Sequence, residues 1–204
     1  MATPTFVGSS TRSANGALTK PAGTVDGDLV LIFCTSNSSG SYTTPTGFTI
    51  LSARTGVSGA SFILFQRTVS GDGASWAVAS SSTGYWLSIV LRGQDSTQPD
   101  AGPATAASLD APSVTAVAAD SLLVCFWGCL NSVTMTPPAS MTKRGGFAGT
   151  RSNMVATEDL TASGATGTRT RAAGGSSPGA LTVTIKPVPS GGDPARDADM
   201  LAFF

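Results

Sequence analysis

The side chains that carry out most enzyme chemistry are scarce in this chain. Its 204 residues include no histidine, which excludes Ser-His-Asp and Cys-His catalytic arrangements and histidine-containing metal sites. Glu158 is the only glutamate, and its neighbour Asp159 points to the opposite face if the segment is a strand, so paired carboxylates for glycoside hydrolysis are not expected. We therefore predict no catalytic residues and a protein that is not an enzyme.

The remaining candidates for metal or redox chemistry are two aspartates and three cysteines. Asp26 and Asp28 have a spacing that can bind calcium, but further oxygen ligands do not follow at loop spacing, so a turn is the better interpretation. Cys34, Cys125 and Cys129 are too few and odd in number for a disulfide scaffold. Cys125 and Cys129 would lie on one side of a strand, roughly 13 Å apart, and are interpreted as core residues. We predict no metal and no cofactor.

Two features are candidates for contacts with other molecules. Tyr42, in "SGSYTTPTG", is the one aromatic residue in a polar loop, and we predict that it contacts a ligand or a neighbouring subunit. The last stretch, "PSGGDPARDADMLAFF", follows the final strand with proline, glycine and charge and then an apolar tip. We interpret residues 191–204 as a C-terminal arm that docks on its own domain or on a neighbouring subunit. Its predicted subunit-contact residues are Met200, Leu201, Phe203 and Phe204.

The elements that must position these residues are all strands. Apolar runs of four to eight residues, bounded by Gly, Ser, Thr and Pro clusters, recur along the chain, and no segment keeps a 3.6-residue period over three turns. The predicted strands are Leu29–Thr35, Phe48–Arg54, Ser61–Val69, Ala74–Ser80, Trp86–Arg92, Ser113–Val117, Ser121–Leu130, Met141–Arg144, Ser152–Leu160 and Ala180–Pro187.

The two halves of the chain resemble each other. "LVLIF" at 29–33 matches "LLVCF" at 122–126, Thr44-Pro45 matches Thr136-Pro137, and "LSIVLR" at 87–92 matches "LTVTIK" at 181–186. These matches are collinear, with an offset of about 93 residues. We therefore predict two internal repeats, one at about 20–95 and one at about 113–188.

An apolar sheet needs a partner for its apolar face. Packing the two repeats face to face gives one antiparallel β-sandwich, jelly-roll-like, over residues 1–190. Two side-by-side domains joined by residues 93–112 are the alternative. In the sandwich, "LVLIF" would be a central strand covered on both faces.

Composition narrows the possible partners. Charged residues make up 12% of the chain, about half the usual share, and the formal net charge is zero. No strong field is available to attract nucleic acid or a membrane surface. A neutral, weakly charged surface suits a subunit covered in a homo-oligomer or larger assembly, although a soluble monomer rich in Ser and Thr is the alternative. We see no signal peptide and no apolar run of about 20 residues that could span a bilayer.

The motifs also carry a family resemblance. The pattern "GDLVLIFCTSNSS…TTPTGFTIL…FILFQRTVSGDGASWAVASSSTGYWLSIVLRG", followed by "APSVTAVAADSLLVCFWG…MTPPASMTKR…ALTVTIKP", resembles a β-sandwich module of tailed-bacteriophage virion proteins, over residues 5–188. The resemblance implies a non-enzymatic virion component, made in the host cytoplasm, with a major capsid or tail protein as its partner. Such modules occur in capsid decoration proteins and in tail or fibre proteins.

Three functional hypotheses follow. A compact chain without a coiled-coil shaft suits a capsid decoration or cement subunit that stabilises the particle lattice. A tail-tip or fibre module that binds a host receptor or glycan through residues 36–47 and 93–112 is the alternative. A glycan hydrolase on a lectin-like sandwich is a third possibility, disfavoured by the missing histidine and the single glutamate.

Overall fold

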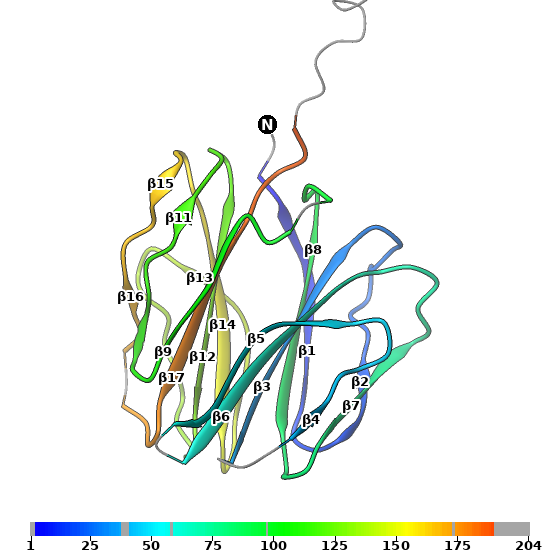
Figure 1. Cartoon of the computed structure of the whole chain (residues 1–204), viewed down its shortest axis with the longest axis vertical. Helices are drawn as coiled ribbons and strands as arrows, with labels where there is room; N and C mark the ends of the chain where they lie inside the picture. Colours follow the sequence, from blue (N-terminus) through cyan, green and yellow to red (C-terminus); the bar gives the residue numbers. More distant parts are fainter. Residues whose placement is uncertain (1–2, 38–40, 58, 97, 173, 190–204) are drawn as a thin grey trace, which may run out of the picture.

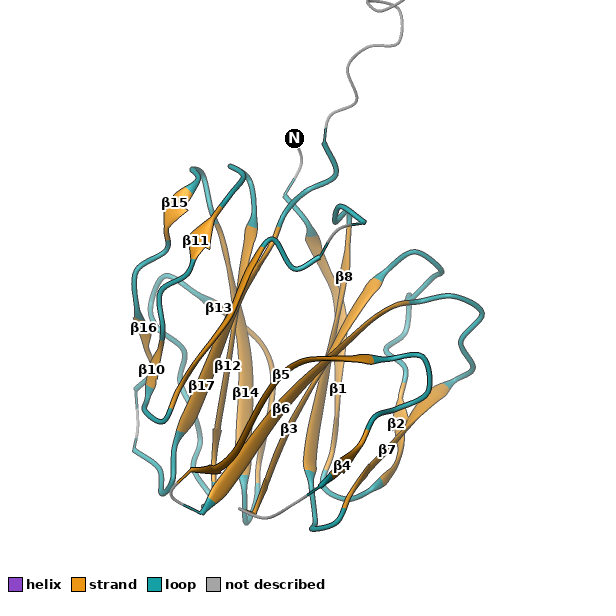
Figure 2. Cartoon of the chain, in the orientation of Figure 1, coloured by secondary structure: helices purple, strands orange, loops and turns teal. Residues whose placement is uncertain are grey.

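A computed structural model describes residues 3–37, 41–57, 59–96, 98–172 and 174–189. These residues form strands and loops without a helix (Figures 1 and 2), so no membrane-spanning helix is found among them. The strands are β1 Thr5–Arg12, β2 Gly16–Thr19, β3 Leu29–Asn37, β4 Tyr42–Thr43, β5 Thr49–Val57, β6 Ala60–Thr68, β7 Ser75–Ser80, β8 Tyr85–Arg92, β9 Ala101–Ala106, β10 Asp110–Ala111, β11 Thr115–Ala116, β12 Leu122–Cys129, β13 Thr142–Ala148, β14 Ser152–Asp159, β15 Gly164–Ala165, β16 Arg169–Thr170 and β17 Gly179–Ile185.

Two five-stranded sheets form the body of the molecule. The first has the strand order β1-β8-β3-β6-β5, and the second has the order β13-β14-β12-β17-β9. Every neighbouring pair in both sheets is antiparallel. The first sheet therefore comes from the N-terminal half of the chain and the second from the C-terminal half (Figure 1).

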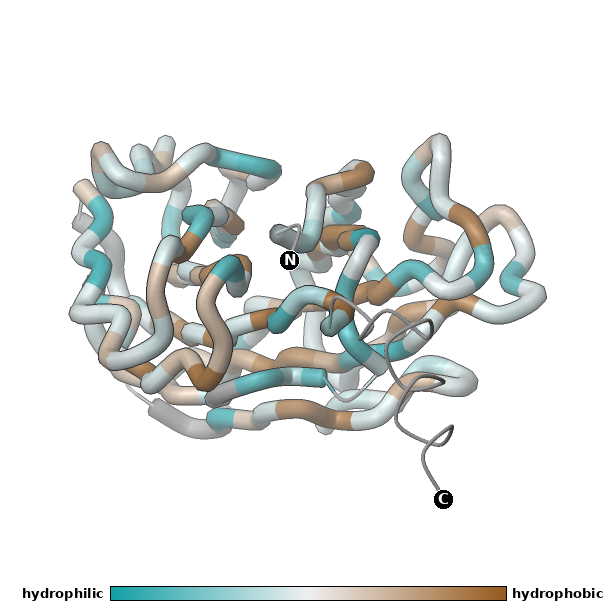
Figure 3. Tube along the Cα trace, turned by 90° about the horizontal axis from the view of Figure 1, so that it is seen from above, coloured by the Kyte–Doolittle hydropathy of each residue, from teal (hydrophilic) through white to brown (hydrophobic). Residues whose placement is uncertain are grey.

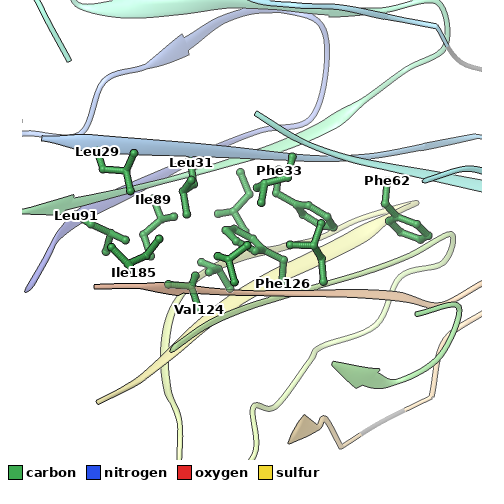
Figure 4. Close-up of a cluster of buried hydrophobic side chains, with 14 of the residues drawn as sticks. Leu29, Leu31, Phe33, Phe62, Ile89, Leu91, Val124, Phe126 and Ile185 are labelled. Atoms are coloured by element: carbon green, nitrogen blue, oxygen red, sulfur yellow. The ribbon is translucent and has the colours of Figure 1, made fainter. Parts of the chain in front are cut away.

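The two sheets pack face to face over a common apolar core. Alternate residues of β3, such as Leu31 and Phe33, point into this core, where they meet Val124 and Phe126 of β12. Figure 4 shows these side chains pointing toward one another from the two layers. Burial of this kind stabilises a fold by about 25 cal/mol per Å² of apolar area removed from water.

Smaller strands cover the outer face of each large sheet. Val30 and Ile32, on the opposite face of β3, pack against Trp76 and Val78 of β7. Behind the second sheet, Leu123, Cys125 and Trp127 pack with Ala111 and Val114, near the ribbons β10–β16 and β11–β15. The central strands are therefore covered on both sides, as their uninterrupted apolar sequences predict. Viewed from above, apolar (brown) and hydrophilic (teal) stretches alternate along the trace (Figure 3).

Each predicted strand corresponds to a strand of the structure, but the prediction missed others. The clearest omissions are β1 and β9, each of which lies at an edge of a large sheet. β1 reads "TFVGSSTR" and β9 reads "AGPATA", so neither has the apolar run that marks a buried strand. Proline is compatible with β9 because an edge strand leaves some of its N–H groups unpaired by the sheet. Residues 93–112, which join the two repeats, therefore also contribute the edge strand β9 to the second sheet.

Candidate functional site

Tyr42 packs within the chain in the described structure. Its hydroxyl lies 2.7 Å from the Ser36 hydroxyl, and its ring meets the Trp86 ring edge-on, with centroids 6.3 Å apart. The side chain is half-buried, and burial raises the pKa of the phenol above its ordinary value. Its role as a contact residue stays a prediction. The other predicted contact residues, Met200, Leu201, Phe203 and Phe204, lie outside the described residues, as does the whole arm at 191–204.

The carboxylates considered for chemistry are used to hold the fold together. Asp28 is buried and accepts two hydrogen bonds from Arg92, at 2.7 and 2.9 Å. Glu158 forms a similar bidentate ion pair with Arg169, whose Nε and Nη2 donate to the two carboxylate oxygens at 2.7 and 2.9 Å. Burial is the largest single influence and raises the pKa of each carboxyl. The hydrogen bonds and the charge of the paired arginine, together with a hydrogen bond from the Val25 N–H to Asp28 and one from the Ser140 hydroxyl to Glu158, outweigh it and lower both pKa values. No cluster of three metal-ligating side chains occurs within the described residues.

The three cysteines are free thiols in the core. Cys34 lies in the cluster behind the first sheet, and Cys125 and Cys129 lie in the cluster behind the second sheet. Burial raises the pKa of the Cys125 thiol to about 12 and that of Cys34 well above its ordinary value. Such thiols are poor nucleophiles and poor metal ligands because both roles need the thiolate.

A polar cleft at one end of the molecule is the best candidate for a binding site. It has a volume of about 240 Å³ and is lined by Leu29, Gly47, Thr49, Gln66, Arg67, Thr68, Gln94, Asp95, Ser96 and Gln98. Leu29 belongs to the core cluster between the sheets. Thr68 pairs with it on the neighbouring strand β6, and Thr49 lies one strand further along the sheet, on β5, where it pairs with Gln66. We call this the glutamine cleft.

The wall formed by residues 94–96 and Gln98 is fixed to the second sheet. Gln98 donates from Nε2 to the Lys186 carbonyl at 3.0 Å and accepts from the Lys186 N–H at 3.3 Å. Gln94 forms an isolated β-bridge with Pro187, and its amide donates to the Gly27 carbonyl at 2.6 Å. The glutamine cleft therefore lies where the first sheet faces a segment attached to the second sheet.

The charges around the glutamine cleft are paired. Arg67 contacts Asp72 at 2.5 Å and also donates to the Thr46 carbonyl at 2.8 Å. Asp95 lies 3.6 Å from the Lys186 ammonium. With its charges compensated and its other polar groups being amides and hydroxyls, the site can form hydrogen bonds with a ligand but lacks an evident acid–base pair.

A second cleft, of about 270 Å³, occupies the matching position on the second sheet. It is lined by Thr3, Pro4, Thr5, Phe6, Leu122, Arg144 and Asp159. Leu122 begins β12 as Leu29 begins β3, and Asp159 pairs with Leu122 as Thr68 pairs with Leu29. Here the covering segment is residues 3–6, which lead into β1 of the first sheet. We call this the arginine cleft, because the Arg144 guanidinium lies 5.0 Å from the Phe6 ring centroid.

Both clefts lie at the end of the molecule where the chain begins and where Pro189 ends the described C-terminal stretch. Val188 and Pro189 line a neighbouring hollow together with Gln94, Asp95 and Ser96 of the glutamine cleft. Figure 1 shows the N-terminal segment and the residues leading to Pro189 emerging together at the top of the view. This end of the molecule therefore combines two clefts with the points where the chain enters and leaves the body.

Sequence reasoning did not single out the cleft glutamines. Gln94 and Gln98 belong to the segment interpreted as a link, and Gln66 occupies one position in a mostly apolar strand. Under the alternative, receptor-binding hypothesis, residues 36–47 and 93–112 provide the contacts, and the glutamine cleft brings Gly47 together with residues 94–96 and Gln98. The signal for the glutamines is spatial, because it depends on how the linking segment lies across the sheet.

Comparison with known proteins returned no match to a protein-family model, a curated protein or a solved structure.

Proposed function

We propose that this protein is a non-enzymatic structural subunit of a tailed-bacteriophage virion, a capsid decoration or cement subunit that binds and stabilises the particle lattice. The observation that carries the proposal is that both clefts lie at one end of the body, together with the points where the chain enters and leaves it, while the carboxylates Asp28 and Glu158 pair with arginines of the fold. Residues 190–204 continue from this end. One end would attach, with the arm as the attachment device, and the opposite end would face outward.

The fold proposal is that the two large sheets are two copies of an internal repeat. Listed from the edge strand that comes first in the chain, the spatial orders are β1-β8-β3-β6-β5 and β9-β17-β12-β14-β13. In both sheets the strands beside one another are therefore the first, fifth, second, fourth and third of that half of the chain. β1 and β9 lie outside the ranges expected from the sequence, so we extend the copies to 5–92 and 101–185. Duplication explains why strands with matching sequences hold matching places. The jelly-roll-like description stays a prediction.

The proposed partners are other virion proteins, a major capsid or tail protein, together with further copies of this chain. A chain with a formal net charge of zero and 12% charged residues has little long-range repulsion to keep its copies apart. Individual interfaces can then be modest, because many copies on one particle add their contacts through multivalency.

The copy number of the chain on purified virions tests this function. A decoration subunit is expected at hundreds of copies per particle by quantitative mass spectrometry, with no binding of the isolated protein to bacterial cells. Deleting residues 191–204 should remove the protein from particles while leaving the soluble domain folded. Retention of the truncated protein at the wild-type level would refute the role of the arm, and absence of the chain from particles would refute the virion role.

The second candidate is a tail-tip or fibre module that binds a host receptor or glycan. One observation favours it: residues from both expected contact loops line the glutamine cleft. This role predicts about a dozen copies per particle or fewer, and direct binding of the isolated protein to host cells. Measured together, copy number and cell binding separate the two functions.

A further inference from the structure

We propose that the glutamine cleft is a binding site for a neutral saccharide unit. The inference rests on the second candidate function, a module that binds a host receptor or glycan, because attachment of a decoration subunit by this end would cover the cleft. It depends on the groups that line the cleft, their surrounding charges and the size of the space.

The lining of the glutamine cleft offers hydrogen bonds of both kinds. Gln66, Gln94 and Gln98 contribute carboxamides, and Thr49 and Thr68 contribute hydroxyls. A carboxamide carries an acceptor oxygen and two donor hydrogens, and a hydroxyl can donate and accept, which matches the repeated hydroxyl groups of a sugar ring.

Two of these amides carry an oxygen that is not yet used. The Oε1 atoms of Gln66 and Gln94 are shielded from solvent, and no hydrogen-bond donor among the described residues reaches either of them. A shielded acceptor without a donor is energetically unfavourable. A ligand hydroxyl that donates to it forms a hydrogen bond without having to replace one from water. Both residues are only partly buried as a whole, so their side chains can adjust to a ligand at the mouth of the cleft.

The charges favour a neutral ligand. The Arg67 guanidinium is held by Asp72 and by the Thr46 carbonyl, and Asp95 faces Lys186. An anionic ligand would have to displace Asp72 from Arg67, and a cationic ligand would have to displace Lys186 from Asp95. Leu29 borders the cleft but is only 3% exposed, so hydrogen bonds from the amides and hydroxyls would provide most of the binding.

Size favours a single sugar ring over a peptide strand. The volume of about 240 Å³ is below the range of about 300–1,000 Å³ typical of drug-sized ligand sites, which suits one sugar ring. β3 and β6 each pair on both sides within the sheet, and of the three strands that line the cleft only β5, which carries Thr49, is an edge strand. Leu29 is the one large apolar side chain of the lining, which leaves few pockets for peptide side chains.

The arginine cleft provides an internal control. It has a similar volume, but Asp159 occupies the position that Thr68 holds in the glutamine cleft. Its lining lacks carboxamides and includes Arg144, so it does not offer the same neutral set of donors and acceptors. A substitution there changes the same end of the molecule without touching the proposed sugar site.

Saturation-transfer NMR on the full chain tests the proposal, using D-glucose, D-galactose, D-mannose and N-acetyl-D-glucosamine separately at about 10 mM, a concentration that detects millimolar affinity. At least one sugar should receive saturation from the protein. Calorimetry should then show that Gln66→Leu weakens binding by about tenfold or more, as expected for the loss of a buried hydrogen bond. Asp159→Asn in the arginine cleft should bind like wild type, and circular dichroism should show that both variants are folded.

Three results would overturn the site: no saturation of any of the four sugars, wild-type binding by Gln66→Leu, or equal weakening by Asp159→Asn. If Gln66→Leu does not fold, Thr49→Val replaces it, since Thr49 is exposed and the change removes a hydroxyl with little change in size. Because the copy number on virions is measured independently, failure of sugar binding leaves the lattice proposal standing, and failure of the lattice proposal leaves the sugar site standing.

Discussion

Phe33 and Phe126 pack against each other in a tilted arrangement at the centre of the core, with ring centroids 5.2 Å apart and ring planes at 31°. They occupy matching positions in "LVLIF" and "LLVCF", 93 residues apart in the chain. β3 and β12 are the middle strands of their sheets, so the contact joins the two halves where they are most deeply buried. The similar strand sequences of the two halves thus meet face to face.

Truncating either ring should strongly destabilise the protein. Phe33→Ala and Phe126→Ala should each lower the free energy of unfolding by about 3–5 kcal/mol, because each removes a fully buried ring and leaves a cavity. Their effects should differ from additivity by about 0.5–1.5 kcal/mol in a double-mutant cycle, since the rings contact each other. Urea unfolding can be followed by the fluorescence of the buried tryptophans. Ile50→Ala, at a side chain that is 51% exposed, serves as the control, and a cost below about 1 kcal/mol for Phe33→Ala would contradict this account of the core.

A glycine pair makes room for a core phenylalanine. Gly128 and Gly179 lie opposite each other on β12 and β17, and a Cβ added at Gly128 would lie 2.6 Å from Cε1 of Phe62. Gly128→Ala should therefore cost about 1–3 kcal/mol through overpacking. Gly73→Ala, where an added Cβ meets open space, should be close to neutral. Equal denaturation midpoints for the two variants would show that the core can absorb the added methyl group.

The Asp28–Arg92 pair predicts acid sensitivity. The native pKa of Asp28 is lowered, so its contribution to stability is complete above the ordinary aspartate pKa of about 4 and is lost as pH falls through the lower native value. Wild-type stability should therefore decline below about pH 4. Asp28→Asn should be less stable at neutral pH and should lose less stability on acidification. Thermal melts between neutral and acidic pH check this, and an unchanged acid slope in the variant would refute it.

Glu158 should behave in the same way because its native pKa is also lowered by its paired arginine. Glu158→Gln should reduce part of the acid slope, and the double variant with Asp28→Asn should reduce more of it than either change alone. Calorimetric melts of the three variants measure this. An acid slope in the double variant as steep as that of wild type would place the sensitive groups elsewhere.

The three thiols should be unreactive in the native protein. Cys34, Cys125 and Cys129 are each 0% exposed, and burial raises the pKa of the first two. A chromogenic disulfide reagent at about pH 8 should therefore label the native chain slowly, at a rate limited by unfolding, and should label three thiols at once in denaturant. Rapid native labelling of any one of them would show that its side of the core opens readily.

Much of the fold could be predicted from the sequence because buried strands leave a strong local pattern. "LVLIF" is apolar at every position, and the structure covers both of its faces, as the pattern predicts. The edge strands β1 and β9 could not be found in this way, because partly exposed strands tolerate Gly, Ser and Pro. Tyr42 illustrates the other difficulty: its polar neighbours indicate exposure, but its ring packs against Trp86, a residue 44 positions away in the chain.

The sequence by itself determined the all-β class, the buried central strands and the exclusion of histidine chemistry, since these depend on residue types and on short-range alternation. Only the tertiary structure decided which segments lie together at the clefts. Gln66, Gln94 and Gln98 meet because Gln94 and Gln98 are held by Pro187 and Lys186, directly after the last strand of the second sheet, while Gln66 belongs to the first sheet. Contacts between segments so far apart in the chain arise from the packing of whole sheets, and the local sequence carries no signal for them.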